Sequence, residues 1–169
     1  MEKRYTVAVL VRNQFGVLNR VTSMFRRRQF NIDNLTVSET ESPDYSRITV
    51  QFAGERVTKQ QLVDQLYKLP DVCSIRELDN ENSVSFELLL IKLKNEPASR
   101  GDIMAAADAF EAKTVDYTRD SIVLRVTADS RRIDDFIDLM RDYEILEICR
   151  TGVVSLERGA DTIRKVTNL

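Results

Sequence analysis

The chemistry available to this sequence begins at a short polar turn between an apolar strand and a helix. The strand covers residues 5–11, the turn reads Arg12-Asn13-Gln14-Phe15-Gly16, and an amphipathic helix starts at Val17. The first N–H groups of a helix lack partners within it and carry partial positive charge, so they can bind a carboxylate or a phosphate. A glycine here lets a ligand approach the main chain. The sequence predicts a small-anion site around Gly16, with a tight turn that binds nothing as the alternative.

Other reactive groups are scarce. The chain has no histidine, which removes the commonest general base and metal ligand. Its five glycines are too scattered to form a phosphate-binding loop. Asp134, Asp138 and Asp142 follow one another at helical spacing on the side away from the apolar residues, which is typical of a solvated face. We therefore predict no catalytic residues and no bound metal in this chain.

The composition is that of an ordinary globular protein with material for a core. Of the 169 residues 43% are hydrophobic, and the formal charge is −2, spread along the chain. Because positive and negative charges are mixed along the chain, no electrostatic field of one sign would attract nucleic acid or an anionic membrane. No apolar run approaches the ~20 residues of a membrane helix. We predict a cytoplasmic protein. Cys73 and Cys149 lie in apolar runs without metal or disulfide spacing, which predicts two buried free thiols.

Hydrophobic periodicity gives the same order of elements twice, strand–helix–strand–strand–helix–strand. The first set comprises strands 5–11, 32–39, 46–53 and 72–79 with helices 17–28 and 58–68. The second comprises strands 84–94, 113–118, 121–128 and 145–156 with helices 101–112 and 131–141. This order predicts an α+β fold of two tandem ferredoxin-like βαββαβ sandwiches, joined by a polar linker at 79–83. In each sheet one face or edge is left uncovered and invites a partner chain.

The βαββαβ order also occurs in RNA-recognition modules, and Arg26-Arg27-Arg28 offers a basic cluster. Cations in the last turn of a helix complement its negative end, which is reason enough for the cluster. The predicted strand at 46–53 lacks the glycine and aromatic pattern on which bases would stack. We therefore predict no nucleic-acid partner.

One family resemblance covers nearly the whole chain. It is carried by Val11-Arg12-Asn13-Gln14-Phe15-Gly16-Val17-Leu18-Asn19-Arg20-Val21, by residues 25–37, by Ser46-Arg47-Ile48-Thr49-Val50, by Glu87 and Leu90-Ile91-Lys92, and by Arg150-Thr151-Gly152-Val153-Val154. In order and spacing these segments resemble the acetolactate synthase small subunit, whose first domain is an ACT domain. The resemblance implies an ACT domain at residues 4–79, the family's C-terminal ferredoxin-like domain at 84–158 and a tail at 159–169.

The same resemblance implies a regulatory subunit without catalytic activity. It would activate the acetolactate synthase large catalytic subunit, which carries thiamine diphosphate, magnesium and FAD, while this chain carries no cofactor. It would also confer feedback inhibition by a branched-chain amino acid, typically valine. In the family the small subunits form a homodimer through their ACT domains, and the effector lies at that interface.

By resemblance, the effector carboxylate is bound by backbone N–H groups of a turn made of Asn13, Gln14, Phe15, Gly16, Val17 and Leu18. Asn31 and Ile32 match positions that contribute from the facing subunit, and the Asn31 amide can accept from an ammonium or donate to a carboxylate. Without the resemblance, Asn31 is interpreted as a polar residue that caps the start of a strand. The expected apolar wall consists of Val11, Leu18 and Ile32.

Two residues depart from the family pattern. Phe15 stands where many relatives have proline or a small residue, and Gln29 stands where a glycine is usual. Glutamine in a left-handed turn costs about 1 kcal/mol more than glycine, so this turn is expected to differ locally. Two other functions compete with the regulatory subunit: a stand-alone amino-acid sensor acting on another enzyme or on transcription, and a cofactor-free ferredoxin-like enzyme. The absence of a helix-turn-helix pattern weakens a role in transcription.

Overall fold

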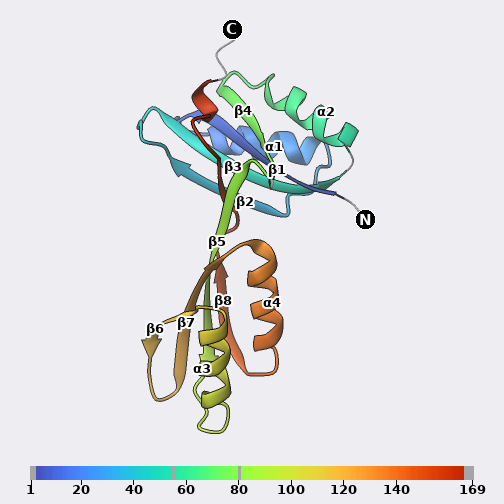
Figure 1. Ribbon diagram of the computed structural model, residues 1–169. Helices are drawn as coiled ribbons and strands as arrows, with labels where there is room; N and C mark the ends of the chain where they lie inside the picture. Colours follow the sequence, from blue (N-terminus) through green and yellow to red (C-terminus); the bar gives the residue numbers. More distant parts are fainter. Residues whose placement is uncertain (1–2, 55, 80, 166–169) are drawn as a thin grey trace. The chain divides into compact units, whose positions relative to one another are not determined.

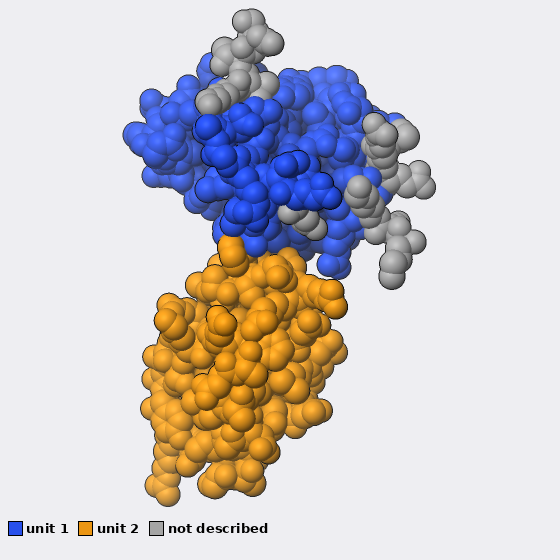
Figure 2. All heavy atoms as spheres, in the orientation of Figure 1, with its two compact units in different colours: residues 1–85, 153–169 blue, residues 86–152 orange. Residues whose placement is uncertain are grey.

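The computed structural model describes residues 3–54, 56–79 and 81–165. The chain forms two compact units, coloured separately in Figure 2: unit 1 contains Met1–Ser85 and Val153–Leu169, and unit 2 contains Phe86–Gly152. Among the helices in the described ranges, none has the length and apolar character needed to cross a membrane.

Unit 1 is built on an antiparallel sheet with the strand order β2-β3-β1-β4, and Figure 1 shows its two helices on one face. Its main elements are β1 (Lys3–Arg12), α1 (Val17–Arg27), β2 (Asn34–Glu39), β3 (Tyr45–Gly54), α2 (Arg56–Leu66) and β4 (Val72–Leu78). Every second residue of β1 points to the helices, and the apolar residues of α1 recur with a 3.6-residue period, so the two sets of side chains form the core together. Val7 and Val9 of β1 are fully buried in one cluster with Val21 and Phe25 of α1.

Unit 2 repeats this plan, with the order β6-β7-β5-β8. Its elements are β5 (Ser83–Lys94), which begins in unit 1, then α3 (Arg100–Ala109), β6 (Lys113–Tyr117), β7 (Ser121–Ala128), α4 (Ser130–Met140) and β8 (Ile145–Arg150). Leu89 and Ile91 are fully buried with Ile133 and Phe136 of α4, as the periodicity predicts. The expected fold class of two tandem βαββαβ ferredoxin-like sandwiches is confirmed.

The strand expected at 145–156 is in fact two strands. β8 ends at Arg150 and β9 (Val154–Glu157) begins four residues later, because Gly152 takes a φ of 86° that interrupts the extended chain. β9 pairs with β5 and lies in unit 1. By its contacts the chain therefore groups residues from Val153 onward with residues up to Ser85, and Phe86–Gly152 form the other unit.

Part of the second face of the unit 1 sheet, which its own helices do not cover, is covered by the chain's C-terminal part, while β2 and β4 lie at the edges of the sheet. Ala8 and Leu10, which point away from α1 and α2, are buried with Ile163 of a 3₁₀ helix at Ile163–Lys165. The segment expected to be a tail from residue 159 onward thus contributes to a small second core.

Cys73 and Cys149 are free thiols as expected, but neither is fully buried. Cys73 is half-buried and Cys149 is exposed. Cys149 pairs with Leu90 on β8, an edge strand, where it lies on the face away from α3 and α4. The prediction of a buried Cys149 was wrong because an apolar run does not distinguish an edge strand from a central one.

Candidate functional site

The turn between β1 and α1 is closed around Gly16, which is the N-cap residue of α1. Gly16 has φ 80° and ψ −2°, a left-handed conformation that L side chains rarely adopt. The Val17 amide donates to the Gln14 carbonyl at 3.3 Å, and the Arg20 amide donates to the Gly16 carbonyl at 3.0 Å. Glycine is therefore needed here for the backbone conformation itself, independently of any ligand.

Several backbone N–H groups at this turn remain available to a ligand. Within the described ranges, the amides of Gly16, Leu18 and Asn19 donate to no protein acceptor. The first turn of α1 also contains no acidic residue whose carboxylate could occupy them. The start of α1 is thus a group of donors with partial positive charge, the arrangement that suits a carboxylate.

Asn13 has a positioning contact in this structure. Its backbone N–H donates to the Asp44 carbonyl at 2.7 Å, and its side-chain amide donates to Glu39 Oε1 at 3.0 Å and to the Pro43 carbonyl at 2.9 Å. These bonds fasten the turn to the β2–β3 hairpin loop. Both amide hydrogens are used, so the side chain of Asn13 offers only its carbonyl oxygen for further contacts.

Arg20 is a site residue that sequence analysis missed, since its period placed it only on the polar face of a helix. Its Nε donates to Asp71 Oδ2 at 2.7 Å, and a Cβ added to Gly16 would lie 3.3 Å from its Nη1. Asp71 is itself fixed, because its carbonyl accepts the Arg12 N–H at 2.9 Å. The four-residue spacing from Gly16 is the signal that could have found Arg20, since i and i+4 share a helix face.

The other predicted contact segment lies at the far end of α1. Asn31 is exposed, and its amide Nδ2 is 3.5 Å from Asp33 Oδ1, while Ile32 is half-buried against the core. The 11 residues of α1 separate this segment from Gly16 by about 16 Å of helix. One copy of the chain does not bring the two segments together, so a joint role for Asn31 and Ile32 stays a prediction that requires the facing subunit.

The apolar residues of the predicted site differ in accessibility. Val11 and Val17 are 2% and 3% exposed and belong to the core, whereas Leu18 is 38% exposed and Phe15 is 103% exposed. Of the turn's side chains, Leu18 and Phe15 are therefore the apolar groups that an external ligand or a second chain can reach.

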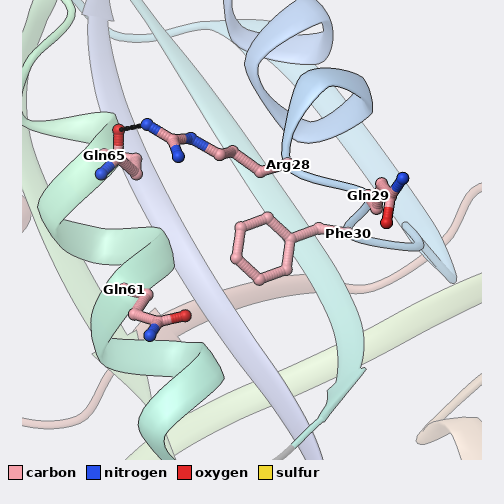
Figure 3. Close-up of a pocket in the computed structure, with 5 residues that line it drawn as sticks. All are labelled: Arg28, Gln29, Phe30, Gln61 and Gln65. Carbon is pink, nitrogen blue, oxygen red and sulfur yellow. Dashed lines mark hydrogen bonds between the residues drawn. The ribbon is translucent and has the colours of Figure 1, made fainter.

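A surface cavity of about 590 Å³ lies elsewhere in unit 1, between the end of α1 and α2. Figure 3 shows the Phe30 ring pointing toward α2 and the Arg28 side chain extending to Gln65, with Nη2 donating to Oε1 at 3.0 Å. Gln29, beside it, has a φ of 57°, so it keeps a left-handed conformation despite the glutamine, at the turn where the sequence predicts a local difference. Gln61 completes the lining, and the cavity includes no residue of the predicted effector site.

A βαββαβ unit with an open, glycine-centred turn before its first helix is the arrangement of an ACT-type regulatory domain. Residues 7–74 match the family model described as the AHAS small subunit-like ACT domain, and residues 86–159 match the model described as the small subunit of acetolactate synthase. Together the two models extend over most of both units.

Relatives with curated names match this chain over most of its length. The chain is 45% identical over 156 residues to the probable acetolactate synthase small subunit of Archaeoglobus fulgidus, which covers 92% of this chain and 98% of that one. It is 41% identical over 155 residues to the acetolactate synthase small subunit of Bacillus subtilis, at 90% of each chain. The crystal structure of the small subunit from Thermotoga maritima superposes with a TM-score of 0.87 at 32% identity, over 94% of this chain and 99% of that one. The chain belongs to the acetolactate synthase small subunit family.

Proposed function

We propose that this chain is the regulatory, non-catalytic subunit of an acetolactate synthase. It activates a large catalytic subunit and makes that subunit sensitive to a branched-chain amino acid, with valine as the first candidate. Family membership supports this role, and the relatives' names imply a larger catalytic partner. In this proposal thiamine diphosphate, magnesium and FAD belong to the large subunit, which condenses two 2-oxo acids in the cytoplasm.

The observation that carries the effector part of the proposal is the set of open amides at Gly16, Leu18 and Asn19, with the guanidinium of Arg20 beside them. A free amino acid has a carboxylate, an ammonium and a side chain. The turn supplies donors and positive charge for the carboxylate. The exposed Leu18 supplies an apolar contact for a branched side chain.

The remaining effector contacts come from a second copy of the chain in this proposal. Residues 4–79 act as the effector-binding and dimerising ACT domain, and Asn31 and Ile32 of one copy face the Gly16 turn of the other. The sheet order supports an edge contact, because β2 is an edge strand and its Val37 is 43% exposed. The effector then lies between the two copies, and its ammonium is accepted by the Asn31 side chain.

Feedback follows from differential affinity. Valine can shift the balance between an activating and an inhibited arrangement only by as much as it binds one more tightly than the other, typically about 1 to 3 kcal/mol. Inhibition is therefore expected to be graded or partial, with a plateau of residual activity at saturating valine.

The test is reconstitution with a thiamine-dependent large subunit, followed by titration with valine, leucine and isoleucine. We expect co-purification, activation, and inhibition by at least one of the three. A chain that binds valine but neither binds nor activates the large subunit would instead be a stand-alone sensor. Activity of the isolated chain on 2-oxo acids would contradict the non-catalytic role.

The variant Gly16→Asp localises the effector site. It adds a carboxylate where the effector carboxylate belongs and a side chain to a left-handed residue, so valine affinity should fall by more than about tenfold while activation remains. Gly101→Asp is the matched control, because Gly101 lies in the first turn of α3 with no atom within 4 Å of an added Cβ. Retained valine inhibition in Gly16→Asp would count against this site.

A further inference from the structure

The chain returns from unit 2 to unit 1 through residues 153–157, here called the return segment. Its side chains alternate between buried and exposed, as in a strand seated on a surface. Val153 and Ser155 are 2% and 5% exposed, while Val154 and Leu156 are 50% and 63% exposed. The segment is thus a regular part of unit 1, lying on the opposite face of the sheet from α1 and α2.

Three strands of the unit 1 sheet hold the return segment by polar contacts. From β2, Asn34 Oδ1 accepts the Val153 N–H at 3.3 Å. From β3, Arg47 Nη2 donates to the Ser155 carbonyl at 2.7 Å. From β4, Arg76 Nε lies 3.5 Å from Glu157 Oε2. The contacts span the sheet from its β2 edge to its β4 edge, so a change in the position of any of these strands acts on the segment.

The charged members of this group have few alternatives to the return segment. Burial lowers the pKa of Arg47, and the charge of Glu157 opposes that shift. Arg76 Nε is buried and lacks a hydrogen bond among the described residues, so its ion pair with Glu157 is its main compensation. Loss of Glu157 would leave the Arg76 guanidinium without this ion pair at a partly buried position and would remove the charge that opposes the shift at Arg47, which favours displacement of the segment.

The position of Asn34 connects this contact to the predicted effector site. Asn34 begins β2, two residues after Ile32 and three after Asn31. A ligand that moves or orders residues 31–33 therefore acts on a strand start whose side chain holds Val153. Val153 follows Gly152, the last residue of unit 2, so one hydrogen bond joins the strand that follows the effector segment to the chain where it leaves unit 2.

We propose that the return segment transmits the state of the effector site to residues 86–152, with Asn34 and Glu157 as the residues that position it. The proposal rests on the proposed function and deepens it, since it names the element through which bound amino acid changes the catalytic subunit. Neither residue contacts the effector in this account. Substituting these residues should therefore leave effector binding intact and weaken the inhibition that the bound effector causes.

The test uses the full chain with its large subunit and the variants Asn34→Ala, Glu157→Gln and their combination. Ser38→Ala is the matched control, because Ser38 lies on the same face of β2 and is exposed. Hydrogen exchange is followed at residues 153–157, valine binding to the small subunit by calorimetry, and inhibition in the reconstituted enzyme.

We expect faster exchange at 153–157, a valine Kd within about twofold of the unaltered chain, and a half-inhibiting valine concentration raised by about fivefold or more. Ser38→Ala should change none of these. Unchanged exchange would show that the contacts do not hold the segment. Faster exchange with normal inhibition would overturn the coupling while the effector site stands. Absence of branched-chain amino-acid binding to the unaltered chain would remove the proposed function, and this inference with it.

Discussion

Unit 1 and unit 2 each pass from a central strand into their first helix through a turn, at residues 13–16 and 95–99. In unit 1 the amides of Gly16 and Leu18 meet no acceptor within the described ranges. In unit 2 the first amide of α3 has an acceptor, whereas the amides of Gly101 and Asp102 meet none within the described ranges. The Asn95 N–H donates to the Asp120 carbonyl at 3.0 Å, and the Arg100 N–H donates to the Glu96 carbonyl at 3.0 Å.

The two helices differ in charge at the same place. α3 has Asp102 in its first turn, whereas α1 has no acidic residue there. Unit 2 therefore supplies its own negative charge to the positive end of its first helix, and unit 1 leaves that end open to an external anion. The two helix starts thus differ in the charge of one first-turn residue rather than in the architecture.

The two units also differ in how exposed their ion pairs are. In unit 1 the side chains of Arg20 and Asp71 are 46% and 13% exposed, so the guanidinium remains reachable from solvent. In unit 2 Arg150 pairs with Glu87, whose side chain is only 1% exposed, and Ser130 donates to the same carboxylate. The unit 2 pair stabilises an interior, while the unit 1 pair holds a charge at the surface beside a turn.

The largest effect is expected from Arg150→Met. The substitution leaves Glu87 buried without its cationic partner, and breaking such a pair typically costs about 3–5 kcal/mol. Urea unfolding monitored in unit 2 should show this loss. Arg141→Met is the control, because its ion pair with Asp138 is mostly exposed and worth about 0–1 kcal/mol. A loss below about 1 kcal/mol for Arg150→Met would mean that Glu87 is not held as described.

The stability that Arg150 contributes through this pair should also not change with pH near neutrality. The hydrogen bond to Glu87 is the main cause that raises the pKa of Arg150. A group with a raised folded-state pKa contributes stability fully below its unfolded pKa and loses it only as pH rises through the folded one. For an arginine both values lie far above neutral pH, so Arg150 stays charged in the folded and unfolded chain, and the unaltered chain should lose none of this contribution between pH 7 and pH 9 in urea unfolding.

The sequence predicted the elements well because each has a regular period. The pattern of Val17, Val21 and Phe25 gave α1 to within one residue of its observed end at Arg27. Local patterns of this kind depend on neighbouring residues and can be read without the fold.

The sequence could not show features that depend on the path of the chain. Residues 145–156 are a mostly apolar run interrupted at Thr151-Gly152, and this local break does not indicate that the chain leaves one unit for the other there. The cover over Ala8 and Leu10 comes from Ile163, more than 150 residues away. Arg20 was missed for a related reason, because its partner Asp71 follows α2. The roles assigned to Asn31 and Ile32 stay predictions, since they need a second copy of the chain.

A smaller effect, opposite in sign between the units, is expected from alanine at the two helix-start glycines. Gly16→Ala places a Cβ at φ 80° and 3.3 Å from Arg20 Nη1, which should destabilise the chain by about 1–2 kcal/mol. Gly101→Ala enters open space in a helix and should stabilise it by about 0.5–1 kcal/mol. Thermal unfolding of both variants measures the difference. Equal signs would contradict the assignment of Gly16 as the only one of this pair that needs a left-handed backbone.

An effect on stability smaller than that of Arg150→Met is expected from Arg20→Met, because the Arg20 side chain is 46% exposed although Asp71 is only 13% exposed, and the pair contributes about 1 kcal/mol. If Arg20 instead serves the turn electrostatically, valine affinity should fall by about three- to tenfold while the unfolding curve barely moves. Valinamide, which lacks the carboxylate charge, should bind the unaltered chain and Arg20→Met alike. A variant that loses stability and valine affinity together would make Arg20 a structural residue like Arg150. The contrast between the two helix starts would then rest on the presence of Asp102 in α3 and the absence of an acidic residue in the first turn of α1.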